Sequence, residues 1–174
     1  GNMKFALNGA LTIGAMDGAN IEIHDAVGAE NIFIFGMTVE DAKRVRAEGY
    51  NPMAYVEKNE KLKRIFSLIE NDFFSPGECG IFKPLLDSLR LDTYMIAADF
   101  ESYCQTQLLV ADTYRNSREW NKRSVMNIAN MGYFSSDRST QEYADKIWHV
   151  APYHVEPETE SLLFDSGKNK RKKN

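Results

Sequence analysis

The sequence predicts an α/β fold over roughly its first fifty residues and a mainly helical arrangement beyond them. Strand and helix signals alternate at short intervals up to Gly49, with short loops between them, a pattern typical of a doubly wound sheet. Asn31–Gly36 is a continuous apolar run between turn residues, as in a parallel strand covered on both faces. Two strands are too few to complete such a sheet, so we expect its other strands upstream of Gly1.

The first strand and its flanking helices follow from residues 2–28. Asn2–Asn8 has helical composition and stops at Gly9, a residue suited to the end of a helix. Leu11–Met16 is a short apolar stretch with β-branched residues, which favours a strand. Asp17 then occupies an N-cap position, and the helix it begins is expected to end near Gly28.

The second strand leads into another capped helix. Thr38 with Asp41 three residues later has the capping-box pattern, and Gly49 marks the end of that helix. Asn51-Pro52 is a further start signal, and Phe73–Gly77 is a break. Between them an apolar stripe recurs at i, i+3, i+4 and i+7, formed by Leu62, Ile65, Phe66 and Ile69.

The remainder of the chain reads as successive helices. Ile81–Leu89 is a short one, Asp99 is expected to cap a longer one, and Ser117 to begin the next. Ser139 with Glu142 forms the capping-box pattern of a last helix. The aromatic-rich helices between residues 94 and 148 are interpreted as core, with part of their apolar surface exposed. On the helix after Ser117, the inner side is predicted to carry Trp120, Val125, Ile128 and Ala129.

Composition excludes several classes of protein. A net charge of −4 gives no global indication of a nucleic-acid or anionic-membrane partner. No apolar run approaches the roughly 20 residues that span a bilayer, so no membrane segment is predicted. Two cysteines, Cys79 and Cys104, are too few for a disulfide scaffold and lack zinc-site spacing, which favours reduced thiols in a cytoplasmic protein.

The two ends of the chain are unusual. It opens without an initiator methionine, so we interpret it as a fragment. Apolar periodicity fades after about Pro157, and the chain ends in the basic run Lys168–Lys173. We therefore expect one domain over residues 1–155 and a disordered basic tail over residues 156–174. Such a tail also matches the composition of a nucleic-acid contact or a nuclear address, which we consider the weaker interpretation.

Lys4 is the main candidate for chemistry. A lysine in the first turn of a helix opposes the helix dipole, so its placement needs a reason. One reason is a Schiff base with an aldehyde cofactor that carries a phosphate. The backbone N–H groups of Gly1, Asn2 and Met3 would then help to bind that phosphate. The alternative is a solvated lysine, which is what most lysines are.

Other candidates have structural explanations. Gly14–Gly18 joins a strand to a helix but lacks the G-x-G-x-x-G spacing of a dinucleotide site, so its glycines are expected to permit close packing. Asp99 and Glu101 could pair as glycosidase acids, although an N-cap followed by a first-turn acid explains them better. The histidines lack neighbouring ligands and are assigned to surface or helix-end positions: His24, His149 and His154.

A family resemblance favours the cofactor-binding interpretation of Lys4 over that of a solvated lysine. Gly1-Asn2-Met3-Lys4-Phe5, followed by Leu7–Gly14 and Met16–Asn20, resembles the cofactor-lysine signature of the glycogen (α-glucan) phosphorylases. Further blocks continue this resemblance in order over nearly 150 residues: Phe33–Met37, Gly49–Asn51, Phe73–Pro76, Ala98–Phe100, Asn116–Trp120, Asn127–Ala129, Phe134–Ser139, Tyr143-Ala144 and Ile147-Trp148.

The resemblance implies a function. Family members use inorganic phosphate to cleave terminal α-1,4-linked glucose from glycogen or another glucan, releasing glucose 1-phosphate. It implies a GT-B-type glycosyltransferase of two Rossmann-like domains, of which this chain would be an incomplete part of the second. It also implies pyridoxal 5'-phosphate bound to Lys4, with Gly1 and Asn2 near the cofactor phosphate, and an allosteric cytoplasmic homodimer.

Two rival functions stay open at this point. The family's phosphate-binding lysine and arginine, and its sugar-contacting acidic segment, have no match in this chain, so the isolated chain is expected to be inactive. A non-catalytic truncated product or structural domain is therefore one alternative. A nucleotide-sugar glycosyltransferase of the GT-B type is the other, disfavoured because such enzymes do not need the Gly-Asn-Met-Lys segment.

Overall fold

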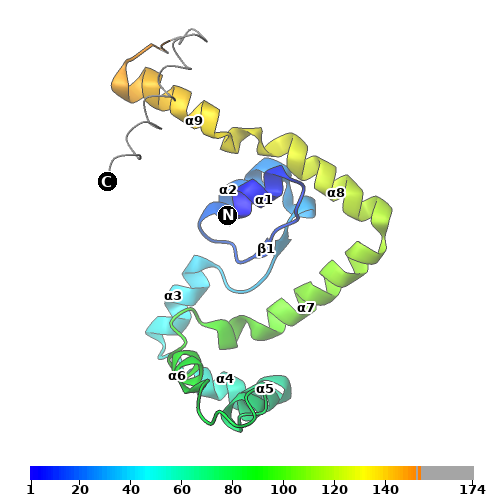
Figure 1. The fold of residues 1–174 in the computed structure, drawn as a ribbon, viewed down its shortest axis with the longest axis vertical. Helices are drawn as coiled ribbons and strands as arrows, with labels where there is room; N and C mark the ends of the chain where they lie inside the picture. The colour runs from blue at the N-terminus through cyan, green and yellow to red at the C-terminus, as the bar shows by residue number, and fades with distance from the viewer. Residues whose placement is uncertain (152, 154–174) are drawn as a thin grey trace, which may run out of the picture. The chain divides into compact units, whose positions relative to one another are not determined.

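The computed structural model describes residues 1–151 and residue 153 (Figure 1). The chain divides into two compact units, the first covering Gly1–Tyr133 and the second beginning at Phe134. The predicted basic tail, residues 156–174, lies outside the described residues.

The first unit is helix-rich with a small parallel sheet. Its elements in chain order are α1 (Asn2–Leu7), β1 (Ile13–Gly14), α2 (Ala19–Val27), the 3-10 helix η1 (Ala29–Asn31), β2 (Phe33–Ile34), α3 (Val39–Ala47), α4 (Pro52–Lys58), α5 (Glu60–Glu70), α6 (Lys83–Leu91), α7 (Ile96–Arg115) and α8 (Ser117–Asn130). The short 3-10 helix η2 (Met131–Phe134) follows α8.

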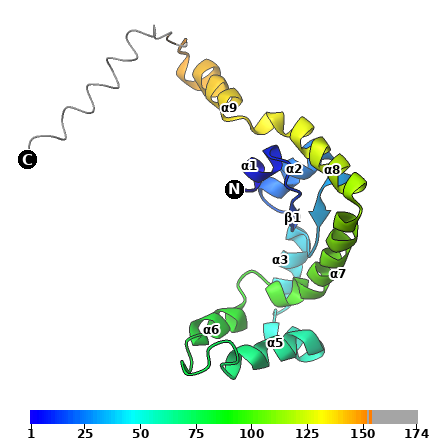
Figure 2. The ribbon, with the colours of Figure 1, turned by 45° about the vertical axis from the view of Figure 1, so that its right-hand side comes forward.

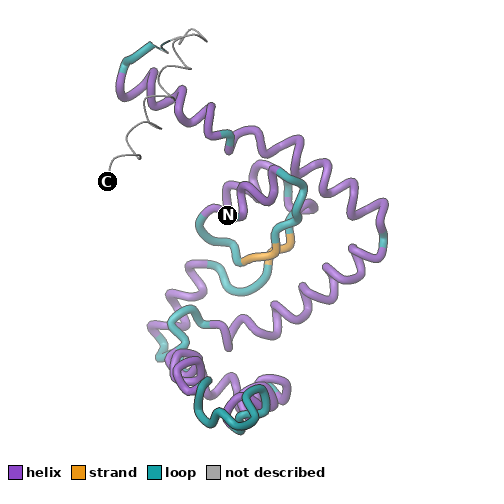
Figure 3. The backbone as a smooth tube through the Cα atoms, viewed as in Figure 1, coloured by secondary structure: helices purple, strands orange, loops and turns teal. Residues whose placement is uncertain are grey.

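The two strands pair in parallel, as the sequence predicts (Figure 3). Ile13 lies opposite Phe33, and Gly14 lies opposite Ile34. Each strand has only two residues, so the prediction of a strand over Asn31–Gly36 is too long. Its first residue belongs to η1, and Gly36 at its other end has a φ of +79°, which ends extended backbone.

Helix α8 packs against α1, α2 and η1 through a stripe that includes a buried amide (Figure 2). Asn127 is fully buried, and its Nδ2 donates to the carbonyls of Asn31 at 2.8 Å and Arg123 at 3.0 Å. Trp120 lies on the same stripe, 6.5 Å from the ring of Phe33. The predicted inner side of α8 is therefore wrong for three of its four residues, since exposed positions hold Val125, Ile128 and Ala129.

Helices α4, α5 and α6 pack with the start of α7 around an ordinary apolar core. That core consists of Val56, Leu62, Phe66, Leu86 and Ala97. The apolar stripe predicted on α5 is confirmed at Leu62 and Phe66, both buried, while Ile65 is exposed. We call these helices, with the start of α7, the helical region. We call α1, β1, α2, η1, β2 and α8 the N-terminal region.

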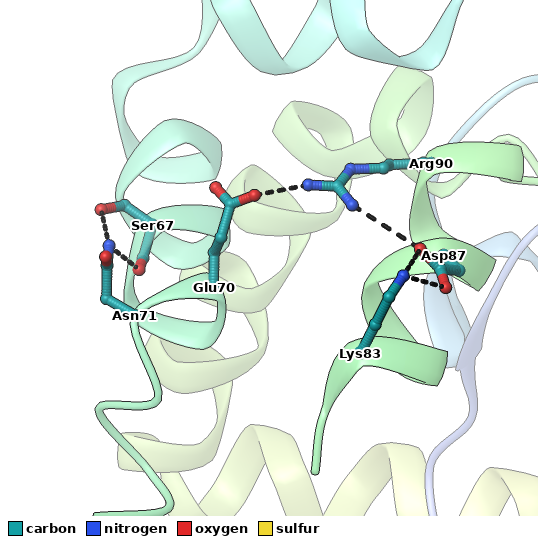
Figure 4. Close-up of polar contacts among 6 residues, drawn as sticks. All are labelled: Ser67, Glu70, Asn71, Lys83, Asp87 and Arg90. Carbon is teal, nitrogen blue, oxygen red and sulfur yellow. Dashed lines mark hydrogen bonds and ion pairs between the residues drawn. The ribbon is translucent and has the colours of Figure 1, made fainter. Parts of the chain in front are cut away.

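Surface ion pairs join α5 to α6 (Figure 4). The guanidinium of Arg90 lies 2.6 Å from Glu70 on α5 and 3.6 Å from Asp87 on its own helix. Lys83 also binds Asp87, at 3.1 Å. All four side chains are exposed, so each pair contributes at most about 1 kcal/mol.

Two of the predicted helix caps are confirmed, at Thr38 and Asn51, while those at Asp17, Asp99 and Ser139 are wrong. Thr38 accepts the backbone N–H of Asp41 at the start of α3, at 3.1 Å. Asn51 accepts a backbone N–H in the first turn of α4. Asp17 does not cap α2, because the N-cap position is one residue later, at Gly18, and has no side-chain hydrogen bond.

Helix α7 is capped by a residue that the sequence did not single out. The predicted cap, Asp99, lies inside the first turn, because α7 begins at Ile96. Buried Asp92 accepts the N–H groups of Ile96 and Ala97, both at 2.8 Å, and the hydroxyl of Tyr50 at 2.7 Å. Burial and the adjacent Asp92 carboxylate raise the pKa of Tyr50 well above its usual value.

The second unit contains α9 (Ser136–Tyr143) and the π-helix η3 (Ala144–Trp148). The predicted capping box is wrong, since Ser139 lies inside α9 and donates its hydroxyl to the carbonyl of Ser135, the N-cap residue. Glu142 instead pairs with Arg138 and Lys146 along the helix.

Much of the aromatic surface predicted as core is exposed. Tyr94 is 85% exposed, Tyr114 on α7 is 66% exposed, and Trp148 on η3 is 58% exposed. Leu108 and Leu109 on α7 are exposed as well. The prediction that part of this apolar surface stays exposed is confirmed, and the broader assignment of these residues to a core is wrong.

Candidate functional site

Lys4 lies in α1 with its side chain exposed. Within the part of the chain that the structure describes, its amino group has no hydrogen-bond or ion-pair partner, while its carbonyl accepts Nδ2 of Asn8 at 2.7 Å. The predicted helix is confirmed. The dipole argument is not, because α1 has six residues and Lys4 is as close to its last turn as to its first.

The residues whose backbone amides are predicted to bind phosphate differ in exposure and in hydrogen bonding. Gly1 is exposed and stands at the N-cap position, where no side chain caps the helix. Half-buried Asn2 turns its Oδ1 toward the N–H of Met3, which donates to it at 3.0 Å. The amide of Met3 is thus already engaged, and Gly1 and Asn2 remain the residues predicted to lie near the cofactor phosphate.

The helix that carries Lys4 is tied to the loop after β1 by two amide side chains. Nδ2 of Asn2 donates to Oδ1 of Asn20 at 3.0 Å. Nδ2 of Asn20 donates in turn to the carbonyl of Ala15 at 2.9 Å. Asn20 therefore bridges α1 and the residue that directly follows β1.

The other end of α1 is fixed by α8. Ser124 donates its hydroxyl to the carbonyl of Gly9 at 2.7 Å, across 115 residues of sequence. Ala6, between the two attachments, is fully buried. The backbone around Lys4 is thus held at both ends and packed along one side, while the Lys4 side chain itself is exposed.

The loop after β2 is held by the start of α7. The N–H of Met37 donates to Oδ1 of Asp99 at 2.9 Å, and the N–H of Gly36 donates to the hydroxyl of Ser102 at 2.9 Å. A Cβ at Gly36 would lie 2.6 Å from the Asp99 carboxyl group, so only glycine permits this approach. Burial raises the pKa of Asp99 despite its hydrogen bond to Met37.

Asp99 and Glu101 do not act as a pair of glycosidase acids in this arrangement. Glu101 accepts from Gln105 at 3.0 Å and from Asn59 at 3.2 Å, and these hydrogen bonds lower its pKa. Asp99 instead holds Met37. The two carboxylates therefore have separate partners and separate structural tasks. Asp99, predicted as the helix cap, is the acid in the first turn of α7, the place predicted for Glu101.

An open pocket of about 570 Å³ lies between the loop after β1, helix α3 and the start of α7. It is lined by Ala15, Asp17, Met37, Thr38, Val39, Ala42, Lys43, Arg46, Ala47, Tyr94, Met95 and Asp99. Arg46 is engaged with the carbonyl of Thr93 at 2.8 Å. Lys4 does not line this pocket, so the structure does not bring the candidate lysine and this hollow together.

The remaining candidates keep their structural explanations. His24 lies beside Asp25, and Nδ1 of His149 lies 2.8 Å from the carbonyl of Asp145 at a helix end. His154 lies outside the described residues. Among the described residues, no group of histidine, cysteine and carboxylate side chains is placed to hold a metal ion. No helix in that part of the chain is long and apolar enough to span a membrane.

Sequence reasoning missed Asn20 and Ser124, the side chains that hold α1. Asn20 stands at the end of the Met16–Asn20 block, where its residue type was visible but its partner 18 residues away was not. Ser124 lies on α8 between Trp120 and Ile128, where its partner 115 residues away was not visible. A polar side chain that binds a distant carbonyl leaves no periodic signal in a sequence.

Comparison with known proteins identifies related sequences. The family model described as carbohydrate phosphorylase matches residues 1–150. The glycogen phosphorylase of Synechocystis sp. (strain ATCC 27184 / PCC 6803 / Kazusa) is 45% identical over 174 residues, 97% of this chain and 20% of that protein. The human brain-form glycogen phosphorylase is 49% identical over 153 residues, 87% of this chain and 18% of that protein.

The rabbit (Oryctolagus cuniculus) muscle-form glycogen phosphorylase is similar as well, with 46% identity over 153 residues. The chain spans about a fifth of the length of the curated relatives that it matches. The matched stretch includes every residue of the Lys4 helix, the parallel strand pair and α8.

Proposed function

This chain belongs to the carbohydrate phosphorylase family, and from that premise we propose that it forms part of a glycogen phosphorylase that uses pyridoxal 5'-phosphate. The proposed reaction is phosphorolysis of terminal α-1,4-linked glucose in glycogen or another α-1,4-glucan, with inorganic phosphate as co-substrate and glucose 1-phosphate as product. The observation that carries this proposal is 45% identity to a glycogen phosphorylase across 97% of the chain.

Lys4 is the proposed attachment point of the cofactor. Condensation with an aldehyde needs an amine that is accessible and not held in an ion pair. The exposed amino group of Lys4, which has no partner among the described residues, meets both conditions. Its helix is fixed at both ends, so a group attached to Lys4 would be held in a defined place, an entropic contribution to catalysis.

Gly1 and Asn2 are proposed to lie near the cofactor phosphate. Their positions just before and at the start of α1 support this, since Gly1 is exposed and has no side chain to obstruct an approaching group. When bound, the cofactor supplies a phosphate group that works beside the substrate phosphate in proton transfer. Lys4 would attach and orient the cofactor, and the reaction would not use the cofactor ring as an electron sink.

The finer architecture also belongs to this proposal. A parallel strand pair followed by helices supports a Rossmann-like second domain of the GT-B type over residues 1–155. We further propose a cytoplasmic, allosteric homodimer as the working form of the whole enzyme. The residues contributed by this chain would supply the cofactor lysine, and the rest of the enzyme would supply the contacts to glucan and phosphate.

A labelling experiment tests the cofactor site. The 174-residue chain is mixed with pyridoxal phosphate, reduced with borohydride, digested and mapped. We expect modification at Lys4 ahead of the other lysines, with imine absorbance that disappears in Lys4→Arg. Lys43→Arg is the matched control, because Lys43 is also exposed but lies on α3. Indiscriminate labelling of the wild-type lysines would contradict the assignment.

An activity assay tests the reaction. The upstream residues of the cyanobacterial glycogen phosphorylase are joined to Gly1, and the longer chain is assayed for glucose 1-phosphate from glycogen and phosphate. We expect activity that depends on added pyridoxal phosphate and is lost in Lys4→Arg. If the Lys4→Arg enzyme retained its cofactor and degraded glycogen normally, the assignment of Lys4 would be wrong. Transfer of glucose from a nucleotide sugar to the glucan, with release of the nucleotide, would favour the glycosyltransferase alternative.

A further inference from the structure

A continuous chain of three hydrogen bonds runs from the residue before Lys4 to the end of β1. The N–H of Met3 donates to Oδ1 of Asn2, Nδ2 of Asn2 donates to Oδ1 of Asn20, and Nδ2 of Asn20 donates to the carbonyl of Ala15. The three distances are 3.0, 3.0 and 2.9 Å. This hydrogen-bond chain passes from helix α1 through helix α2 to the loop after β1.

These three hydrogen bonds all run in one donor-to-acceptor direction, which fixes the orientation of both side-chain amide groups. Reversing Asn20 would place its oxygen against the carbonyl of Ala15 and its nitrogen against the nitrogen of Asn2. Reversing Asn2 would place its nitrogen against the N–H of Met3. Each reversal puts like groups face to face and breaks two bonds, so the network itself determines the orientation of both side chains.

Gly14 closes the space around the central amide. A Cβ built on Gly14 would lie 2.5 Å from Nδ2 of Asn20, closer than any ordinary contact. That nitrogen is therefore enclosed between the last residue of β1 and the carbonyl of Ala15, to which it donates. Asn20 thus has little room to move away from the strand, and α1 is held at a fixed distance from the sheet.

We propose that Asn20 is a positioning residue for the cofactor lysine and acts through Asn2 as one unit. The inference rests on the proposed function, since it assumes that Lys4 is the attachment point. Asn20 holds the start of α1 through Asn2, two residues before Lys4, and so sets where the lysine amine stands relative to the carboxyl end of β1. No contact between Asn20 and the cofactor is required for this role.

The experiment measures selectivity for Lys4, which is independent of catalysis. Wild-type chain and variants are titrated with pyridoxal phosphate, trapped with borohydride, and the ratio of Lys4 labelling to mean labelling of the other lysines is determined by mass spectrometry. We expect Asn20→Ala and Asn2→Ala each to lower this ratio about threefold to tenfold. Because the two act as one unit, the double variant should fall no further than either single variant.

Two more variants separate positioning from simple loss of structure. Gly14→Ala removes no polar group and displaces Asn20 by contact alone, so it should lower the ratio in the same range. Asn130→Ala is the matched control, because Asn130 also donates to a backbone carbonyl but is exposed on α8. It should leave the ratio unchanged. Circular dichroism and urea unfolding of every variant identify any that do not fold.

The outcomes are distinguishable. If the wild type shows no preference for Lys4, the proposed function fails and the inference fails with it. If the wild type is selective and folded Asn20→Ala or Gly14→Ala keeps its full ratio, only the positioning role is wrong. If the fold-losses in labelling ratio of Asn20→Ala and Asn2→Ala multiplied in the double variant, the two residues would not act as one unit. Should Asn20→Ala not fold, Asn2→Ala and Gly14→Ala decide the question by the same ratio.

Discussion

The N-terminal region and the helical region of the first unit are held together by different kinds of contact. In the helical region, apolar side chains such as Leu62 and Phe66 form the core, and the charged groups between α5 and α6 lie at the surface. In the N-terminal region, two of the most deeply buried side chains are amides, Asn31 and Asn127, and each donates to a backbone carbonyl. The candidate lysine belongs to this second kind of region.

The difference has a physical meaning. Apolar contacts are strong in sum but tolerate small shifts, because they have no preferred direction. Hydrogen bonds between buried amides and carbonyls contribute less on balance, yet they are directional and costly to leave unmade. A region that must hold one amine in one place benefits from directional hydrogen bonds. A supporting group of helices needs only buried apolar contacts.

The largest effect is expected in the apolar core. Phe66→Ala removes a buried ring from the centre of the helical region and should lower the free energy of unfolding by about 3–5 kcal/mol. Urea unfolding of the chain measures it. Phe73→Ala is the control, because Phe73 is 65% exposed, and it should change stability little. Equal losses in the two variants would mean that the apolar core does not hold this region.

A smaller effect is expected at the buried amide of α8. Asn127→Ala removes the bonds to the carbonyls of Asn31 and Arg123 and should lower stability by about 2 kcal/mol. The loss is limited because Oδ1 of Asn127 is buried without a partner among the described residues, and its desolvation penalty disappears too. Exposed Asn130→Ala serves as the comparison. No loss at Asn127 would remove the distinction between the two regions.

The carboxylate that holds the loop after β2 gives a pH-dependent prediction. Burial raises the pKa of Asp99, so the folded state binds its proton more tightly than the unfolded state. Stability from this group is therefore greatest at low pH and falls as pH rises from about 3.9, the unfolded value, through the raised folded value. Asp99→Asn keeps an acceptor for the N–H of Met37 and removes this dependence.

The measurement follows unfolding of the wild type and Asp99→Asn between pH 3 and pH 7. The variant should gain on the wild type as pH rises, by under about 1 kcal/mol, because solvent screens this half-buried group. Asp112→Asn, at an exposed ion pair with Arg115, should show no such gain. A variant that instead lost stability as pH rose would show that the carboxylate is favourable in its charged form.

The smallest effect is expected at the surface of the helical region. Arg90→Ala removes the contacts to Glu70 and Asp87 but should change stability by only about 0.5 kcal/mol, since all three groups are exposed. Unfolding in low and high salt checks this, because the small contribution should shrink as salt rises. A salt-independent loss of several times this size would indicate that Arg90 contributes through packing of its side chain.

The sequence was informative where a pattern is local. The cap at Thr38, the buried stripe positions Leu62 and Phe66, and the parallel pairing of the two strands are all confirmed. It was misleading on α8, where three of the four residues predicted for the inner face, Val125, Ile128 and Ala129, are exposed. Exposed apolar residues are ordinary on a protein surface, so apolar spacing alone cannot identify the buried side of such a helix.

The contacts that place Lys4 were beyond local reasoning for a different reason. Asn20 reaches Asn2 on a helix 18 residues earlier, and Ser124 reaches the carbonyl of Gly9 across 115 residues. Each depends on how elements pack, which no window of sequence contains. The family resemblance pointed to Lys4 directly, yet it gave no account of what holds the lysine in place, and the role proposed for Lys4 itself stays a prediction.

The bond from Ser124 to Gly9 has a consequence for how the chain is made. Residue 9 leaves the ribosome more than a hundred residues before its partner, so α1 must wait for α8 before this attachment can form. A nascent or shortened chain that stops ahead of residue 124 would carry the lysine on a helix secured at one end only. Maturation of the cofactor site would then be timed by the synthesis of a distant helix.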